Sequence, residues 1–232
     1  QTVIARRVTL AHQEIPSAFA AIKIYCDRAL QARATYIENN GIVIGLPEMF
    51  VKHLGEMQMS YPGFYQDREP GTDGKPETGV KPNVGITVDV GTGLYIPVIK
   101  NVLDKSLADI ADEMMEFRLK ALRQTFKEEE LSGGHITLSL HTENDITLAI
   151  PIIFPTQTCI LSLCSVQEEL YLDQAESVSL RHYCNLGITY DHRSINGAAA
   201  VQFLQTLKSS IETLKIPGEE PGTRTANEDA LS

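Results

Sequence analysis

Apolar positions recur along the chain with two different spacings, and the spacing changes several times between residues 19 and 214. Apolar residues that recur every three to four positions predict helices, whereas two-residue alternation and short β-branched runs predict strands. The expected helices are residues 27–40, a segment from 46 to a stop at 61–63, residues 107–122, and a last helix from 198 to 214. The expected strands are residues 19–25, 83–89, 94–100, 146–153, 159–166 and 178–190. The last three of these strands are rich in Ile, Leu and β-branched residues, as interior strands of a mixed sheet should be.

Residues at the ends of these segments support the helix boundaries. Asp27 is expected to cap the first helix, and Gly41 follows its end. Pro47 suits the first turn of the second helix. Ser106 and Asp109 form a capping-box pattern at the start of the third.

Two segments carry neither spacing. Residues 67–82 are rich in glycine and proline and are expected to form a loop. Residues 216–232 are rich in proline, glycine and acidic residues, which predicts a mobile acidic C-terminal tail. The remaining residues, 1–215, are expected to form one large domain.

Composition excludes several classes of partner. The 232-residue chain has a net charge of −10 and no block of Lys or Arg, so no nucleic-acid partner is expected. No apolar run approaches the roughly 18 residues of a membrane span, and we expect neither a membrane partner nor a signal peptide. Cys26, Cys159, Cys164 and Cys184 form no Cys-x-x-Cys pair and are expected to be small buried hydrophobic residues in a reducing cytoplasm. No residue set has metal-ligand spacing, so no metal is expected.

A polar turn between the last strand and the last helix carries the candidate chemistry. His192 lies in this turn, and an imidazole with a pKa of about 6.5 can be neutral at physiological pH and act as a base. The polar residues around it are Asp191, Arg193 and Asn196. From the residues alone, His192 is equally compatible with a general base and with a hydrogen-bonded structural residue.

Two motifs in the chain resemble those of a known family. Residues 191–197 read Asp-His-Arg-Ser-Ile-Asn-Gly before a small-residue helix, and this resembles the active-site signature of the acyltransferase (E2) component of 2-oxo acid dehydrogenase complexes. Residues 133–139 read Gly-Gly-His-Ile-Thr-Leu-Ser, similar to a strand of the same family. The resemblance extends over residues 3–215 and implies the α/β fold of CoA-dependent acyltransferases such as chloramphenicol acetyltransferase, a two-layer sandwich with a mixed central sheet.

The resemblance also implies how individual residues act in acyl transfer from a thioester. His192 is the expected general base, Ser139 the expected donor to the tetrahedral oxyanion, and Asn196 the residue that orients neighbouring groups. A serine nucleophile paired with His192 is the rival mechanism, although the chain contains no Gly-x-Ser-x-Gly elbow. Ser139 taken alone could equally be an inert strand residue. Acetyl-CoA is the expected co-substrate, without a metal.

Further residues are expected to border the channel for coenzyme A and the acceptor. They are Asp191, Arg193, Gly93, Leu94 and His141. Gly93 and Leu94 belong to a segment, residues 83–100, that is similar to the stretch lining the acyl-carrier route in the family. Because the family shares each active site between neighbouring subunits, the resemblance implies a homotrimer with shared active sites.

The residues after Ser139 depart from the family pattern. E2 cores continue with Asn or Ser and then a glycine-containing turn, whereas residues 140–145 here read Leu-His-Thr-Glu-Asn-Asp. Because this segment borders the acceptor side, the departure favours a different acceptor. We therefore expect a free-standing acetyltransferase that acetylates a small hydroxyl compound, such as the hydroxymethyl group of a tetronate in antibiotic biosynthesis. The polar tail at 216–232 also differs from E2 cores and favours the same interpretation.

Two alternatives stay open. One is the E2 core of a dehydrogenase complex, which acylates dihydrolipoamide and assembles into a large cage. The other is an inactive trimeric scaffold, and the intact Ser139, His192 and Asn196 argue against it.

Overall fold

The computed structural model describes residues 15–66, 81–91, 93–143, 145–173 and 175–215. The tail expected at 216–232 and most of the loop expected at 67–82 lie outside these ranges. Within them, no helix is long and apolar enough to cross a membrane.

Groups of helices and groups of strands follow one another along the described chain. The helices are α2 (Asp27–Asn40), α3 (Leu46–Met57), α4 (Leu107–Arg123) and α5 (Gly197–Glu212), with 3-10 turns η1 (Pro62–Phe64), η2 (Val102–Asp104) and η3 (Glu128–Leu131). The strands are β1 (Ser17–Tyr25), β2 (Val84–Ile86), β3 (Val88–Asp89), β4 (Leu94–Tyr95), β5 (Val98–Ile99), β6 (Ile136–His141), β7 (Cys159–Cys164), β8 (Gln167–Leu172) and β9 (Val178–Asp191).

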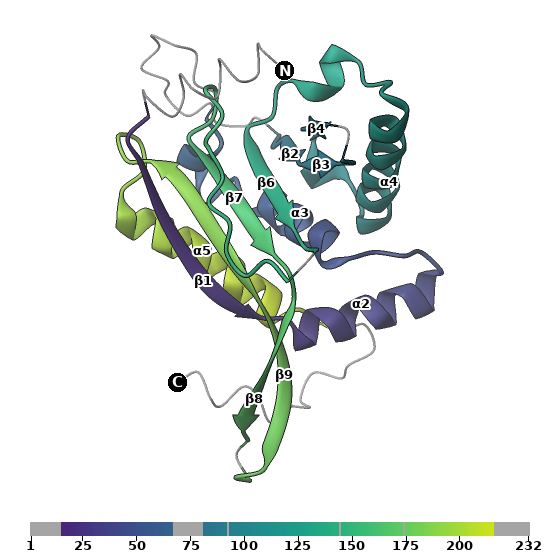
Figure 1. Cartoon of the computed structure of the whole chain (residues 1–232), viewed down its shortest axis with the longest axis vertical. Coiled ribbons are helices and arrows are strands. Elements are labelled where there is room, and N and C mark those ends of the chain that lie inside the picture. Colours follow the sequence, from purple (N-terminus) through teal and green to yellow (C-terminus); the bar gives the residue numbers. More distant parts are fainter. Residues whose placement is uncertain (1–14, 67–80, 92, 144, 174, 216–232) are drawn as a thin grey trace.

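A mixed sheet organises the molecule, with strand order β1-β9-β7-β6-β2-β5 and with β8 paired to β9. β6 runs parallel to β2 and β7, and the other pairs are antiparallel. β9 has 14 residues and projects from the sheet as a hairpin with β8 (Figure 1). β3 and β4 form a separate ribbon. The expectation of an α/β fold with a mixed central sheet is confirmed.

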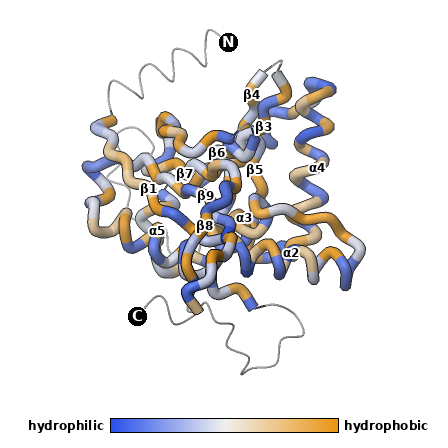
Figure 2. The backbone as a smooth tube through the Cα atoms, turned by 60° about the horizontal axis from the view of Figure 1, so that its bottom comes forward, coloured by the Kyte–Doolittle hydropathy of each residue, from blue (hydrophilic) through white to orange (hydrophobic). Residues whose placement is uncertain are grey.

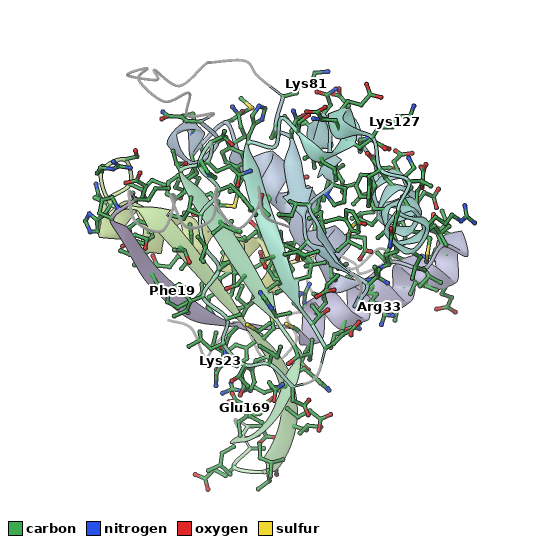
Figure 3. All side chains as sticks on the ribbon, turned by 45° about the horizontal axis from the view of Figure 1, so that its top comes forward. Phe19, Lys23, Arg33, Lys81, Lys127 and Glu169 are labelled. Atoms are coloured by element: carbon green, nitrogen blue, oxygen red, sulfur yellow. The ribbon has the colours of Figure 1, made fainter. Side chains whose placement is uncertain are left out.

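Charged side chains hold the hairpin at its base. Glu169 of β8 accepts hydrogen bonds from Lys23 of β1 and from Nε of Arg181 in β9, the latter at 2.8 Å. Lys23 and Glu169 lie side by side at this point (Figure 3). These contacts join the hairpin to β1 at the edge of the sheet. They lie far along β9 from Asp191, which ends the strand, and from His192, which follows it.

The hydrophobic core lies between the sheet and the helices that cover one of its faces (Figure 1). Ile136 and Leu138 of β6 and Ile188 of β9 point into this core and are fully buried. Phe203 of α5 stacks on Phe64 with ring centroids 4.3 Å apart. A helix that covers a sheet needs one apolar side, so apolar residues recur along it every three to four positions. The tube of α4 accordingly changes repeatedly between hydrophobic and hydrophilic residues (Figure 2).

The opposite side of the same strands carries small polar groups. Successive strand residues point to opposite faces of a sheet, so the neighbours of the core residues in β6, β7 and β9 share one surface. We call this surface the hydroxyl face; its members are Thr137, Ser139, Ser162 and Thr189, all buried. The face brings a candidate catalytic serine into a cluster of hydroxyl groups.

The predicted helices are found in the structure, but one predicted cap is wrong. The residue that precedes α2 as its N-cap is Cys26, and it makes no side-chain capping bond. Asp27 instead accepts hydrogen bonds from the backbone N–H of His182 at 3.1 Å and from its ring Nδ1 at 2.8 Å. Its carboxylate therefore ties α2 to β9.

The strand expected at 146–153 is also wrong, because the backbone there is irregular. The Ile146 carbonyl accepts from the N–H of Ser165 at 3.0 Å, and the Thr147 carbonyl accepts from Asn185 Nδ2 at 2.8 Å. Pro151 and Pro155 lack the N–H that a strand ladder needs. The segment is held by isolated bonds rather than by strand pairing.

Candidate active site

His192 combines a fixed backbone with an accessible ring. It follows the last residue of β9, and its N–H donates to the carbonyl of Pro16 at 3.0 Å. Its ring lies 5.7 Å from the ring of Tyr190 at an angle of 40°. The residue is exposed, so the imidazole is open to a ligand.

Asp191 holds the turn on the N-terminal side of His192. Its carboxylate is fully buried and accepts from Arg193 Nε at 3.0 Å and from Arg193 Nη2 at 2.8 Å. Its backbone N–H donates to the Thr158 carbonyl at 2.9 Å, and its own carbonyl accepts from the N–H of Ile195 at 2.9 Å. Asp191 and Arg193, expected to border the channel, are thus parts of the scaffold that fixes His192.

Asn196 holds the turn on the C-terminal side. It is the N-cap of α5, and its Oδ1 accepts from the N–H of Ala199 at 2.8 Å. This bond satisfies one of the free N–H groups at a helix start and fixes the side chain. Because Oδ1 is used in this way, the side-chain Nδ2 is the part of Asn196 that can donate a hydrogen bond and so orient a neighbouring group.

Ser139 lies in β6 on the hydroxyl face, where only 6% of the residue is exposed. Its Oγ lies 3.0 Å from Nε2 of His141, two residues further along the same strand. Burial lowers the pKa of His141 below its usual range, so its ring is neutral at neutral pH. Of the expected channel residues, His141 is the one that the structure places against Ser139.

Three more hydroxyl groups surround this serine in the sheet. Oγ1 of Thr137, Oγ of Ser162 and Oγ1 of Thr189 are buried and have no hydrogen-bond partner among the described residues. Buried polar atoms without a partner are uncommon and mark places where solvent or a ligand can complete the bonding. None was expected from the sequence, although hydroxyl residues recur at alternate positions of β6.

Gly93 and Leu94 do not belong to the strands that carry the hydroxyl face. Leu94 pairs with Asp89 in the β3–β4 ribbon, and 55% of Leu94 is exposed. The ribbon follows β2, and Thr87 between them accepts from the N–H of Leu140 at 2.7 Å. The channel role expected for Gly93 and Leu94 stays a prediction.

Ser139 and His192 are far apart within one chain. Ser139 pairs with Ser162, which pairs with Gly187, and His192 lies five residues further along the chain. Spacings of about 3.3 Å per residue and about 4.8 Å per strand place the two roughly 19 Å apart. The structure therefore forms two separate groups, Ser139 with His141 and His192 with its turn.

A metal-binding set is absent from the described ranges, since no three His, Cys, Asp or Glu residues lie together in a way that could hold an ion. All four cysteines are free and buried, and burial raises the pKa of Cys159 to about 12. The thiol of Cys159 therefore lacks the thiolate character of a nucleophile.

The family model for the 2-oxoacid dehydrogenases acyltransferase (catalytic domain) matches residues 1–216. A succinyltransferase component of the 2-oxoglutarate dehydrogenase complex from Azotobacter vinelandii is 30% identical over 215 residues, 90% of this chain and 53% of the relative. An acetyltransferase component of the pyruvate dehydrogenase complex from Corynebacterium glutamicum is 28% identical, over 81% of this chain and 28% of the relative. The chain thus spans about half the length, or less, of these relatives.

Solved structures agree on the fold. A probable dihydrolipoamide acetyltransferase from Listeria monocytogenes has a TM-score of 0.83 at 23% identity, covering 94% of both chains. The dihydrolipoamide acetyltransferase of A. vinelandii, investigated for the role of one Ser, one His and one Asn in its mechanism, has a TM-score of 0.83 at 22% identity, covering 91% of this chain and 88% of that one. A chloramphenicol acetyltransferase has a TM-score of 0.54 at 11% identity, covering 89% and 94%.

Proposed function

This chain belongs to the 2-oxoacid dehydrogenases acyltransferase (catalytic domain) family, and from that premise we propose that it transfers an acyl group between coenzyme A and a thiol or hydroxyl acceptor. The observation that carries the proposal is the turn at 191–197. Hydrogen bonds engage Asp191 and Asn196, whereas the His192 ring between them is exposed. A fixed base with an open ring is what proton abstraction from an acceptor requires.

The proposed reaction is a direct transfer. His192 takes the proton of the acceptor thiol or hydroxyl as that atom attacks the thioester carbonyl, and Ser139 donates a hydrogen bond to the resulting oxyanion. The intermediate collapses by breaking the carbon–sulfur bond, and the proton on His192 passes to the sulfur of coenzyme A. The acyl group ends on the acceptor without an acyl-enzyme. The solved A. vinelandii enzyme was investigated for the same three residue types as Ser139, His192 and Asn196, which supports these assignments.

The active site is proposed to form between two copies of the chain. A separation of roughly 19 Å, from the strand spacings, is too large for Ser139 and His192 of one copy to act on one carbonyl. A homotrimer in which each site takes Ser139 from one copy and His192 from its neighbour would bring them together. A solved cubic core of a pyruvate dehydrogenase multienzyme complex, with a TM-score of 0.81, supports assembly of this kind.

Dihydrolipoyl groups are the first candidate acceptor. The relatives are named as dihydrolipoyllysine-residue succinyltransferases and acetyltransferases, which favours the E2 alternative over the free-standing tetronate acetyltransferase expected from the sequence. A small hydroxyl compound is the second candidate. It is supported by the departure at residues 140–145 and by the contact of His141 with Ser139.

A product assay tests the proposal and chooses the acceptor. The protein is incubated with acetyl-CoA or succinyl-CoA and either dihydrolipoamide or a hydroxymethyl tetronate, and acylated products are measured by mass spectrometry. We expect acyl-dihydrolipoamide as the main product. Acylation of the tetronate alone would restore the free-standing interpretation, and no product with either acceptor would contradict enzymatic acyl transfer and leave the scaffold alternative.

A further inference from the structure

We propose that His141 is a positioning residue for Ser139: its Nε2–H donates to the serine oxygen and leaves the serine's single proton free for the acyl oxygen. The inference rests on the proposed acyl transfer and adds a residue to it. His141 lies within residues 140–145, the segment that departs from the family pattern.

The strand backbone brings the two side chains together. Ser139 and His141 are two residues apart in β6, so both point to the same side of the sheet. Ser139 pairs with Ser162 of β7, and the N–H of Leu140 between them donates to Thr87 Oγ1 at 2.7 Å. Contacts on both sides of β6 therefore fix the backbone that holds the 3.0 Å contact between Oγ and Nε2.

The chemistry of a hydroxyl decides the direction of this hydrogen bond. A serine carries one proton and two lone pairs. If Ser139 donated that proton to His141, none would remain for the oxyanion. The bond must therefore run from Nε2–H to Oγ, and a serine that accepts a hydrogen bond becomes a better donor itself.

This direction specifies the tautomer of the ring. Because burial keeps His141 neutral at neutral pH, it carries one ring proton. That proton must lie on Nε2, with Nδ1 bare. The opposite tautomer, with a bare Nε2, would make His141 a base for Ser139 and would favour the rival serine-nucleophile mechanism.

Steady-state kinetics test whether His141 acts through Ser139. His141→Leu removes the donor, and we expect kcat to fall about tenfold, the effect of one hydrogen bond, with KM little changed. His141→Gln places an amide N–H near the position of Nε2, so its kcat should lie within about threefold of the wild-type value. In the Ser139→Ala background, His141→Leu should cost nothing further, because coupled residues are not additive.

The same exchanges at His53 provide the control. His53 lies on α3 and bonds to Glu56, so His53→Leu and His53→Gln should leave kcat unchanged. Wild-type kcat in His141→Leu, no rescue by His141→Gln, or an equal loss in the Ser139→Ala background would each overturn the proposal.

The tautomer is tested without any turnover, so its result stays separate from that of the proposed function. The protein is labelled with 15N-histidine, and the resonance of His141 among the six histidines is identified by its loss in His141→Gln. We expect a proton on Nε2 at neutral pH and a shift of this resonance in Ser139→Ala. A proton on Nδ1, or a resonance indifferent to Ser139→Ala, would overturn the inference even if acyl transfer is found.

Discussion

At the proposed base, His192, the neighbouring residues rather than its own ring make the structural contacts of the turn. Asp191 is buried against Arg193, and Asn196 caps α5. Among the described residues, the histidine between them is held by its backbone and by a tilted ring contact with Tyr190. Removal of the ring should therefore affect chemistry more than folding.

His192→Ala tests this separation. We expect turnover to fall by about 10²–10⁴-fold, the usual contribution of a positioned base. The free energy of unfolding should change by only about 0.5 kcal/mol, as for other exposed residues. Ser194→Ala, at an exposed position in the same turn, should keep full turnover. Activity that survives in His192→Ala would remove His192 from the mechanism.

His141 gives the molecule a pH dependence of stability. Burial lowers its pKa in the folded protein, whereas in the unfolded chain it titrates near about 6.5. Below that pH the unfolded chain binds a proton that the folded chain does not, so the free energy of unfolding falls as the pH falls. Ser139 bonds to the ring, and Cys164 is its strand partner, so neither supplies a charge that would offset burial.

Denaturant titrations at pH 7.5 and 5.5 measure this effect. His141→Gln cannot bind the proton, so it should lose less stability than the wild type between the two pH values. An identical loss in both proteins would assign the pH dependence to other groups.

At the scale of elements, the hydroxyl face depends on close packing of β1, β7 and β9. A Cβ added to Gly187 would lie 2.5 Å from Ser162 Oγ and 2.7 Å from the ring of Phe19. Phe19 projects from β1 (Figure 3). A side chain at position 187 would therefore displace the side chains of Ser162 and Phe19 or the strands that carry them.

Gly187→Ala should lower the free energy of unfolding by about 1–3 kcal/mol, as overpacking does. Ser162→Ala removes the nearer of the two obstacles, so the double variant should lose less than the sum of the single variants. Gly63→Ala is the matched control, because a Cβ there meets nothing within 4 Å. Thermal unfolding of the four variants measures these changes. If the losses of the two single variants simply add in the double variant, the packing argument is wrong.

Elements with a strong local pattern were predictable from the sequence. The Ser106–Asp109 capping box and the apolar stripe of α4 specify that helix without help from the rest of the chain. The segment 146–153 has strand-like residues, but Pro151 within it and Pro155 just after it cannot donate to a ladder. The sequence does not predict β8. Its Leu170 and Leu172 are exposed rather than packed in the core, and the segment is a strand because it pairs with β9.

The candidate site likewise has parts that the sequence predicts and parts that it does not. His192 and Asn196 come from one continuous motif, and the contact of Ser139 with His141 follows from the two-residue period of a strand. The separation of Ser139 from His192 depends on the pairing of β6, β7 and β9. Such pairing joins residues distant in sequence and has no local signal.

At the scale of the whole molecule, a shared site predicts that two inactive variants rescue each other. Ser139→Ala and His192→Ala are co-expressed with different tags, and mixed assemblies are purified on both. A trimer that carries both tags has two chains of one kind and one of the other, so one site in three joins an intact serine to an intact histidine, and activity should recover to about one third of the wild type. If assemblies that carry both tags are no more active than either variant alone, the site lies within one chain and the proposal of a shared site is wrong.

The proposed shared site would make catalysis obey mass action in the protein itself. Each chain would supply either the base or the oxyanion donor to a given site, so a separated chain could stay folded and yet be chemically incomplete. Below the dissociation constant of the assembly, doubling the protein concentration would more than double the rate. Dilution would then act on this protein as a reversible inhibitor.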